Sequence, residues 1–72
     1  MDRTIVILNM YDDLLEDKEV NINRWCADYG ISVSTFYRYI AVLREYVWEK
    51  RKQEIVYDQK INSYKIIDTV RI

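Results

Sequence analysis

Apolar residues recur at helical spacing in three successive stretches of the chain. The first stretch, residues 4–15, is predicted to be a helix whose apolar face consists of Ile7, Leu8, Tyr11, Leu14 and Leu15. The second stretch, residues 22–29, has apolar residues at positions i, i+3, i+4 and i+7, namely Ile22, Trp25, Cys26 and Tyr29. The third begins at residue 33, and its apolar face contains Phe36, Ile40, Leu43 and Val47. The pattern therefore predicts three amphipathic helices.

The second and third helices meet at Gly30, the only glycine in the chain. A glycine at this place adopts the left-handed conformation that ends one helix and turns into the next. Asn21 and Ser32 precede the two helices, and their side chains can accept hydrogen bonds from the first helical turn. A short turn containing glycine between two helices is typical of a helix-turn-helix. We predict this motif over residues 22–47, with the third helix as its recognition helix.

After the third helix, the apolar positions alternate with polar ones, as in β-strands. Two segments, residues 54–57 and 63–67, are rich in β-forming residues and are separated by a polar turn. The residues expected to face inward are Ile55, Tyr57, Tyr64 and Ile66. The chain is therefore predicted to be a single α+β domain over residues 1–72. Its fold is expected to be a winged helix-turn-helix, in which three helices are followed by a β-hairpin wing at residues 54–67.

This order of segments resembles the N-terminal DNA-binding domain of DeoR-like and WYL-type bacterial transcription regulators. The residues that carry the resemblance are Arg3, Ile7 and Leu8, then Tyr29-Gly30-Ile31-Ser32, Thr35-Phe36-Tyr37-Arg38-Tyr39-Ile40 and Leu43-Arg44, and in the wing Ile55, Tyr57, Asp58, Tyr64 and Ile66. Tyr37 and Tyr39 stand where the family pattern has a basic residue and an aspartate. The resemblance implies a regulator without its effector domain. We expect either a stand-alone regulator of phage or mobile-element type or a domain cut from a longer protein.

The N-terminal part of a recognition helix reads base edges in the major groove. The residues expected to do so are Val33, Ser34, Thr35, Tyr37 and Arg38. Arg38 can bind guanine O6 and N7 with two hydrogen bonds, which is worth about 1–3 kcal/mol of discrimination. The alternative for Arg38 is a solvated position or a phosphate contact. The alternative for Thr35 is a role within the first helical turn.

Basic residues further along the chain suit contacts with phosphates, which add affinity without sequence information. The predicted phosphate contacts are Arg44, Lys50, Arg51, Lys52, Lys60 and Lys65. Lys60 lies at the hairpin turn and is the strongest candidate in the wing. For the run at residues 50–52, the alternative is a solvated connector between the third helix and the wing.

Charge is unevenly distributed in this chain of net charge −1. Residues 1–29 carry three basic and seven acidic side chains, a net of −4, whereas residues 30–72 carry eight basic and five acidic ones, a net of +3. The half with the recognition helix is thus the positive one, as expected for a surface that faces nucleic acid. The acidic first helix is also compatible with a basic protein partner. The alternative function is therefore a protein-interaction module or small inhibitor on a winged-helix scaffold.

The ten aromatic residues exceed what one small core requires. Tyr39, Tyr46 and Trp48 are expected to pack at the end of the third helix. As an alternative, these three side chains form an exposed surface for a homodimer or another partner, because aromatic residues are enriched at interfaces.

The sequence lacks the residue patterns of catalysis and metal binding. It has no histidine, no glycine-rich phosphate loop and only one cysteine, so we expect no enzymatic activity, no cofactor and no metal. Neither a membrane-spanning stretch nor a signal peptide is recognisable. The sequence therefore predicts a cytoplasmic protein that binds double-stranded DNA sequence-specifically, as a small transcriptional repressor of phage or mobile-element type.

Overall fold

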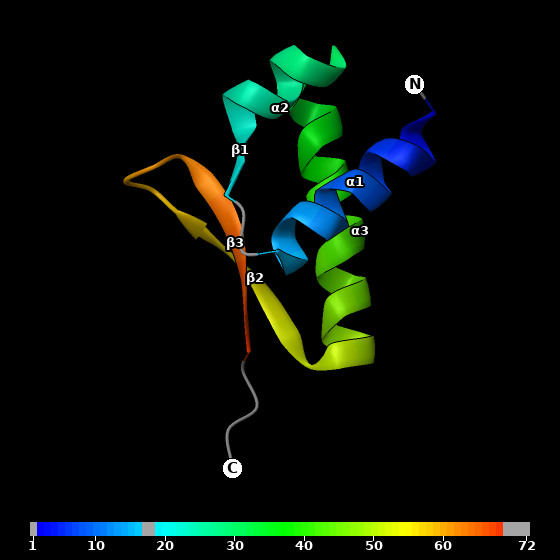
Figure 1. Ribbon diagram of the computed structural model, residues 1–72, viewed down its shortest axis with the longest axis vertical. Coiled ribbons are helices and arrows are strands. Elements are labelled where there is room, and N and C mark those ends of the chain that lie inside the picture. Colours follow the sequence, from blue (N-terminus) through cyan, green and yellow to red (C-terminus); the bar gives the residue numbers. More distant parts are fainter. Residues whose placement is uncertain (1, 17–18, 69–72) are drawn as a thin grey trace.

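A computed structural model describes residues 2–16 and 19–68, which form three helices and a three-stranded sheet (Figure 1). In chain order, the elements are α1 (Arg3–Leu15), β1 (Val20–Asn21), α2 (Ile22–Tyr29), α3 (Val33–Arg51), β2 (Gln53–Asp58) and β3 (Ser63–Asp68). Three helices precede an antiparallel hairpin, which confirms the predicted α+β winged helix-turn-helix arrangement.

The sheet has β3 at its centre, between β1 and β2, and both pairings are antiparallel. The hairpin register pairs Ile55 with Ile66 and Tyr57 with Tyr64, so the four residues predicted to share one face do so. Ile55 and Tyr64 are buried and Ile66 is half-buried. Tyr57 is exposed, contrary to the prediction; it lies on the edge strand β2, whereas its buried partner Tyr64 lies on the central strand β3.

One hydrophobic core joins all six elements. Its buried members are Val6, Met10, Leu14, Val20, Ile22, Trp25, Phe36, Tyr39, Ile40, Leu43, Val47, Ile55 and Tyr64. Met10 of α1 and Phe36 of α3 are fully buried. Burying an apolar side chain of this size contributes about 1.5–3 kcal/mol to stability. The core thereby packs α3 against both α1 and the sheet.

The buried face of α1 differs from the predicted one. It consists of Val6, Met10 and Leu14, with Ile7 and Tyr11 half-buried beside them. Leu8 and Leu15 were expected to be buried and are exposed. Because residues 5–8 are all apolar, the spacing predicts a helix but does not determine which side of it faces the core.

Helix α3 is longer than its apolar pattern requires and ends only at Arg51. Lys50 and Arg51 form its last turn, and Lys52 is its left-handed C-cap with φ 55°. The interpretation of this basic run as a connector is therefore wrong. Cations at this position interact favourably with the negative end of the helix dipole.

The turn between α2 and α3 has the predicted caps. Gly30 is left-handed, with φ 62° and ψ 38°, and the amides of Gly30 and Ile31 both donate to the Cys26 carbonyl. The Ser32 hydroxyl oxygen accepts the Thr35 amide hydrogen at 3.1 Å. These bonds satisfy the Cys26 carbonyl near the end of α2 and one free amide, that of Thr35, at the start of α3.

Substitution of Gly30 tests this turn. Gly30→Ala is expected to lower the free energy of unfolding by about 1 kcal/mol, because a left-handed conformation is unfavourable for a residue with Cβ. Nothing lies within 4 Å of the added Cβ, so the cost is conformational. Thermal unfolding would then shift down by about 4–8 °C. Gly30→Asn should lower the free energy of unfolding by less than Gly30→Ala does. An alanine variant as stable as the wild type would contradict the left-handed conformation of residue 30.

Candidate nucleic-acid interface

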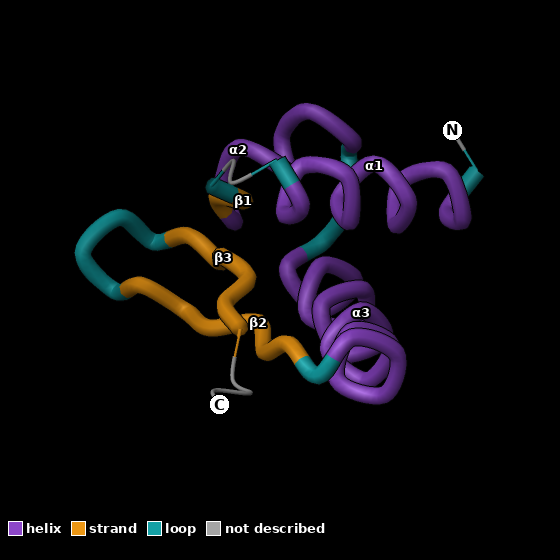
Figure 2. Tube along the Cα trace, turned by 60° about the horizontal axis from the view of Figure 1, so that its bottom comes forward, coloured by secondary structure: helices purple, strands orange, loops and turns teal. Residues whose placement is uncertain are grey.

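Helix α3 and the β2–β3 hairpin lie together on the side of the molecule away from α1 (Figure 2). The core fixes the inner side of α3 and leaves its outer side exposed. A helix held in this way, as the second helix of a helix-turn-helix, can enter the major groove with its N-terminal residues first. The hairpin then lies beside the helix, where it can follow the DNA backbone.

The N-terminal turns of α3 present most of the predicted base-reading residues to solvent. Val33, Ser34, Tyr37 and Arg38 are exposed. Ser34 and Arg38 are four residues apart and therefore lie on the same outward face. Phe36, between them in sequence, points into the core and is fully buried. The outward residues are thus attached to a rigid part of the structure.

Thr35 differs from its neighbours because it is half-buried and takes part in the helix cap. Its hydroxyl oxygen accepts a hydrogen bond from the Ser32 hydroxyl at 3.0 Å, and its amide donates to the same Ser32 oxygen. These contacts agree with the alternative to base reading, in which Thr35 stabilises the first turn of α3.

Tyr37 lies on the side of α3 that faces the wing. Its ring contacts Phe36 edge-on, and the Phe36 ring lies 5.8 Å from the ring of Tyr64 in β3. Burial, with a further contribution from the Tyr37 phenol, raises the pKa of the Tyr64 hydroxyl above its ordinary value, while the cationic Arg44 acts in the opposite direction. Aromatic contacts therefore connect the recognition helix with the wing.

The wing carries its basic residues on exposed positions. Lys60 lies in the hairpin turn, where its amide donates to the Asp58 carboxylate at 3.0 Å. Lys65 is exposed on β3. Arg44 lies where α3 meets β2, and its guanidinium donates to the Ile55 carbonyl at 3.4 Å. Lys60 is thus the cation farthest out on the wing.

The basic run at residues 50–52 is separated from the base-reading end of α3. A rise of 1.5 Å per residue places Lys50 roughly 18 Å from Arg38 along the helix. Arg51 donates to the Tyr11 hydroxyl of α1 at 2.6 Å. The Lys52 ammonium lies 5.3 Å from the centre of the Trp48 ring. The structure therefore does not bring this run together with the N-terminal end of α3.

The three aromatic residues proposed as a dimer or partner surface do not form one. Tyr39 is buried in the core, which leaves it no role on a surface. Tyr46 contacts Tyr11 of α1 in an edge-to-face arrangement at 5.6 Å, whereas Trp48 lines a groove between α3 and β2. Residues two apart on a helix point roughly 200° apart, so Tyr46 and Trp48 lie on opposite sides of α3.

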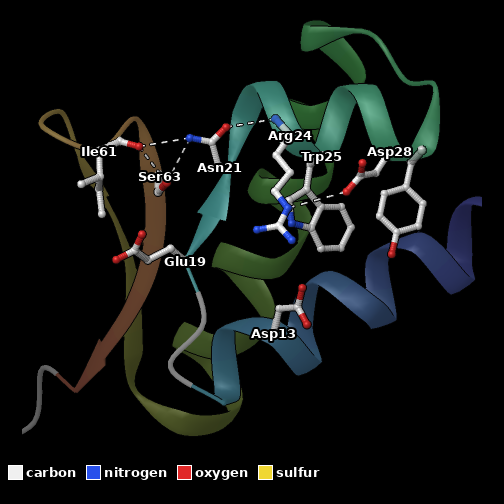
Figure 3. Close-up of a pocket in the computed structure, with 9 residues that line it drawn as sticks. Asp13, Glu19, Asn21, Arg24, Trp25, Asp28, Ile61 and Ser63 are labelled. Carbon is white, nitrogen blue, oxygen red and sulfur yellow. Dashed lines mark hydrogen bonds and ion pairs between the residues drawn. The ribbon is translucent and has the colours of Figure 1, made fainter.

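A second concave surface lies between α1, α2 and the turn of the wing (Figure 3). This cleft has a volume of about 780 Å³ and is lined by Asp13, Glu19, Asn21, Arg24, Trp25, Asp28, Tyr29, Ile61 and Ser63. The ion pair between Arg24 and Asp28 spans 3.8 Å and is exposed, so it contributes little to stability. Sequence reasoning gave Asn21 only the role of a helix cap, and its contacts with the wing, 40 residues away, leave no sequence signal.

The fold and the exposed end of α3 beside a hairpin define a helix-turn-helix domain of the DNA-binding class. Residues 6–66 match the Mga helix-turn-helix domain, and the chain belongs to this family. Its members are non-enzymatic regulators that bind DNA in the control of transcription. Comparison with curated proteins and with solved structures gives no match.

The family match confirms the expectation of a DNA-binding domain from a transcription regulator and agrees with the expected lack of catalysis. The family differs from the DeoR-like and WYL-type regulators that the sequence resembles. Among the described residues, no helix is long and apolar enough to cross a bilayer.

The burial of Tyr64 beside the recognition helix makes stability sensitive to alkaline pH. Because the pKa of Tyr64 is raised in the folded protein, the unfolded chain loses this proton first, at its ordinary pKa of about 10. The free energy of unfolding should therefore fall as the pH rises above about 10. Urea denaturation should show a smaller fall for Tyr64→Phe than for the wild type. Parallel pH dependences of the two proteins would contradict this contribution.

Proposed function

We propose that this protein binds double-stranded DNA sequence-specifically and acts as a small transcriptional repressor of phage or mobile-element type. The observation that carries the proposal is the outward face of α3, where Ser34 and Arg38 are exposed beside a hairpin that carries Lys60. Membership in a family of DNA-binding regulators supports it. A domain of this size represses by occupying its site, and we place this activity in the cytoplasm.

In this proposal, the two exposed elements have different tasks. Arg38 binds a guanine edge, and Val33, Ser34 and Tyr37 contact neighbouring bases or phosphates. Lys60 and Lys65 bind phosphates beside the groove, which adds affinity but no sequence information. Thr35 acts through the helix cap.

The remaining cations contribute mainly through their charge. Arg44 lies at the junction of α3 and β2, and residues 50–52 lie near the far end of α3. These residues raise the positive potential of this half of the chain, which attracts DNA over a longer range. A homodimer would add a second recognition helix and a second half-site about one DNA turn away. This oligomeric state stays a prediction.

Substitution of Arg38 tests base recognition. Arg38→Ala should reduce the preference for the best DNA site, found by selection from random duplexes, over a scrambled site by about 1–3 kcal/mol. Fluorescence anisotropy with both duplexes measures this preference. Arg3→Ala removes an equal charge from α1 and should leave the preference unchanged. An equal loss of affinity on both duplexes would show that Arg38 contacts phosphate.

Substitution of Lys60 tests the wing. Lys60→Ala should weaken binding to every duplex alike, because a phosphate contact does not depend on sequence. The slope of log affinity against log salt should become shallower by about 0.9, the value for one neutralised phosphate. Gln59→Ala, at the neighbouring turn position, serves as the neutral control. An unchanged salt slope for Lys60→Ala would contradict a phosphate contact.

The second candidate function is binding of a basic protein partner by the acidic side of the molecule. The observation in its favour is that, of the described residues that line the cleft, Asp13, Glu19 and Asp28 are acidic and Arg24 is basic. A stoichiometric basic partner, together with no DNA binding at low salt, would favour this function over the first.

A further inference from the structure

Asn21 uses both ends of its side-chain amide, and the two ends serve different elements (Figure 3). Its Oδ1 accepts the Arg24 amide hydrogen at 3.0 Å and caps α2. Its Nδ2 donates to the Ile61 carbonyl at 3.1 Å and lies 3.4 Å from Ser63 Oγ. An amide group has its acceptor on the oxygen and its donors on the nitrogen, so only this orientation satisfies both the cap and the Ile61 carbonyl.

The hairpin turn is organised internally before it meets Asn21. The Tyr57 hydroxyl donates to Asn62 Oδ1 at 2.6 Å, and the Asp58 carboxylate accepts the Lys60 amide. Asn62 has the left-handed φ of 51°, which asparagine tolerates better than most residues. These hydrogen bonds hold the turn together internally, and its contact with α2 is a separate attachment.

That attachment is narrow and lies at the start of α2. β1 pairs with β3 over only two residue pairs, Val20 with Tyr64 and Asn21 with Ser63. Next to these two pairs, the Ile22 amide donates to the Asn62 carbonyl at 3.3 Å. The Asn21 side chain adds the bond to Ile61, the residue next to Lys60. The wing turn is thus bonded to the first residues of the helix-turn-helix.

We infer that Asn21 is the positioning residue of the wing, which places Lys60 so that it and Arg38 reach the same DNA duplex. The inference rests on the proposed function. Helix α2 leads through the Gly30 turn directly into α3, and its buried Ile22 and Trp25 belong to the same core as Phe36. The strands of the wing also contact α3 directly, through Phe36 with Tyr64 and Arg44 with Ile55. The bond from the cap of α2 to the wing turn adds a restraint on the turn itself, and so on the position of Lys60 relative to the recognition helix.

Variants at Asn21 can keep the helix cap and remove the bond to the wing. Asn21→Ser retains a hydroxyl oxygen that caps α2 but is too short to reach Ile61. Asn21→Asp retains the acceptor, adds charge that is favourable at a helix N-terminus and has no donor. The exposed Asn23 offers matched controls two residues along α2, Asn23→Ser and Asn23→Asp.

The first measurement needs no DNA. Heteronuclear NOE values and amide hydrogen exchange should show a more mobile backbone at residues 59–62 in both Asn21 variants, with α2 unchanged. The Asn23 variants should match the wild type in both regions. A wing turn that keeps its wild-type order in both Asn21 variants would overturn the inference, whatever the protein binds.

The second measurement is a double-mutant cycle with a short mixed-sequence DNA duplex at low salt. Asn21→Ser should weaken binding about threefold to tenfold. Lys60→Ala should then reduce the DNA affinity of the Asn21→Ser variant clearly less than it reduces the DNA affinity of the wild type, because Lys60 is no longer held in place in that variant. Independent, multiplicative effects of the two substitutions would overturn the inference while leaving DNA binding intact. A wild-type protein that does not bind the duplex would instead refute the proposed function, and with it the role of Asn21 toward DNA.

Discussion

The burial of one side of α3 is the constraint on which the other features depend. Phe36, Ile40, Leu43 and Val47 are buried in the core that α3 shares with α1 and the sheet. These positions repeat every three or four residues, so the residues between them are directed outward. Ser34 and Arg38 are exposed for this reason, and their geometry is as rigid as the core behind them. A binding surface that is already rigid favours binding of a partner, because little side-chain and backbone freedom is lost when the complex forms.

The charge distribution shows how a chain of net charge −1 can present a surface to DNA. The acidic residues of α1 and α2 lie in the half of the chain with a net charge of −4, and the recognition helix and wing lie in the half with +3. Screening in salt limits the reach of a charge to about 8–10 Å. The local field at α3 therefore depends on its neighbours more than on the total charge. Exposed Arg38 on α3 and Lys60 on the wing both contribute to that local field.

The sequence was informative wherever a feature depends on neighbours along the chain. The caps Asn21 and Ser32, the left-handed Gly30 and the start of α3 follow from local chemistry and were predicted correctly. The buried side of α1 was not, because its apolar residues surround the helix and only packing against other elements selects a face. The opposite placement of Tyr46 and Trp48 on α3, by contrast, follows from their two-residue spacing alone.

The contacts that sequence could not reveal join segments far apart in the chain, and the proposed function depends on them most. The sequence next to a helix is enough to identify a capping residue. The Asn21 side chain, however, caps α2 with its oxygen alone, and its NH₂ group can still donate hydrogen bonds elsewhere. Ser32 similarly accepts the Thr35 amide and donates to the Thr35 hydroxyl. Serine and asparagine at these caps thus satisfy a helix end and leave a donor for a second contact. Aspartate would cap either helix but could donate to neither Ile61 nor Thr35. The donor of Asn21 links the start of α2 to the wing turn, and that of Ser32 orders the first turn of α3, so both act on the elements proposed to contact DNA.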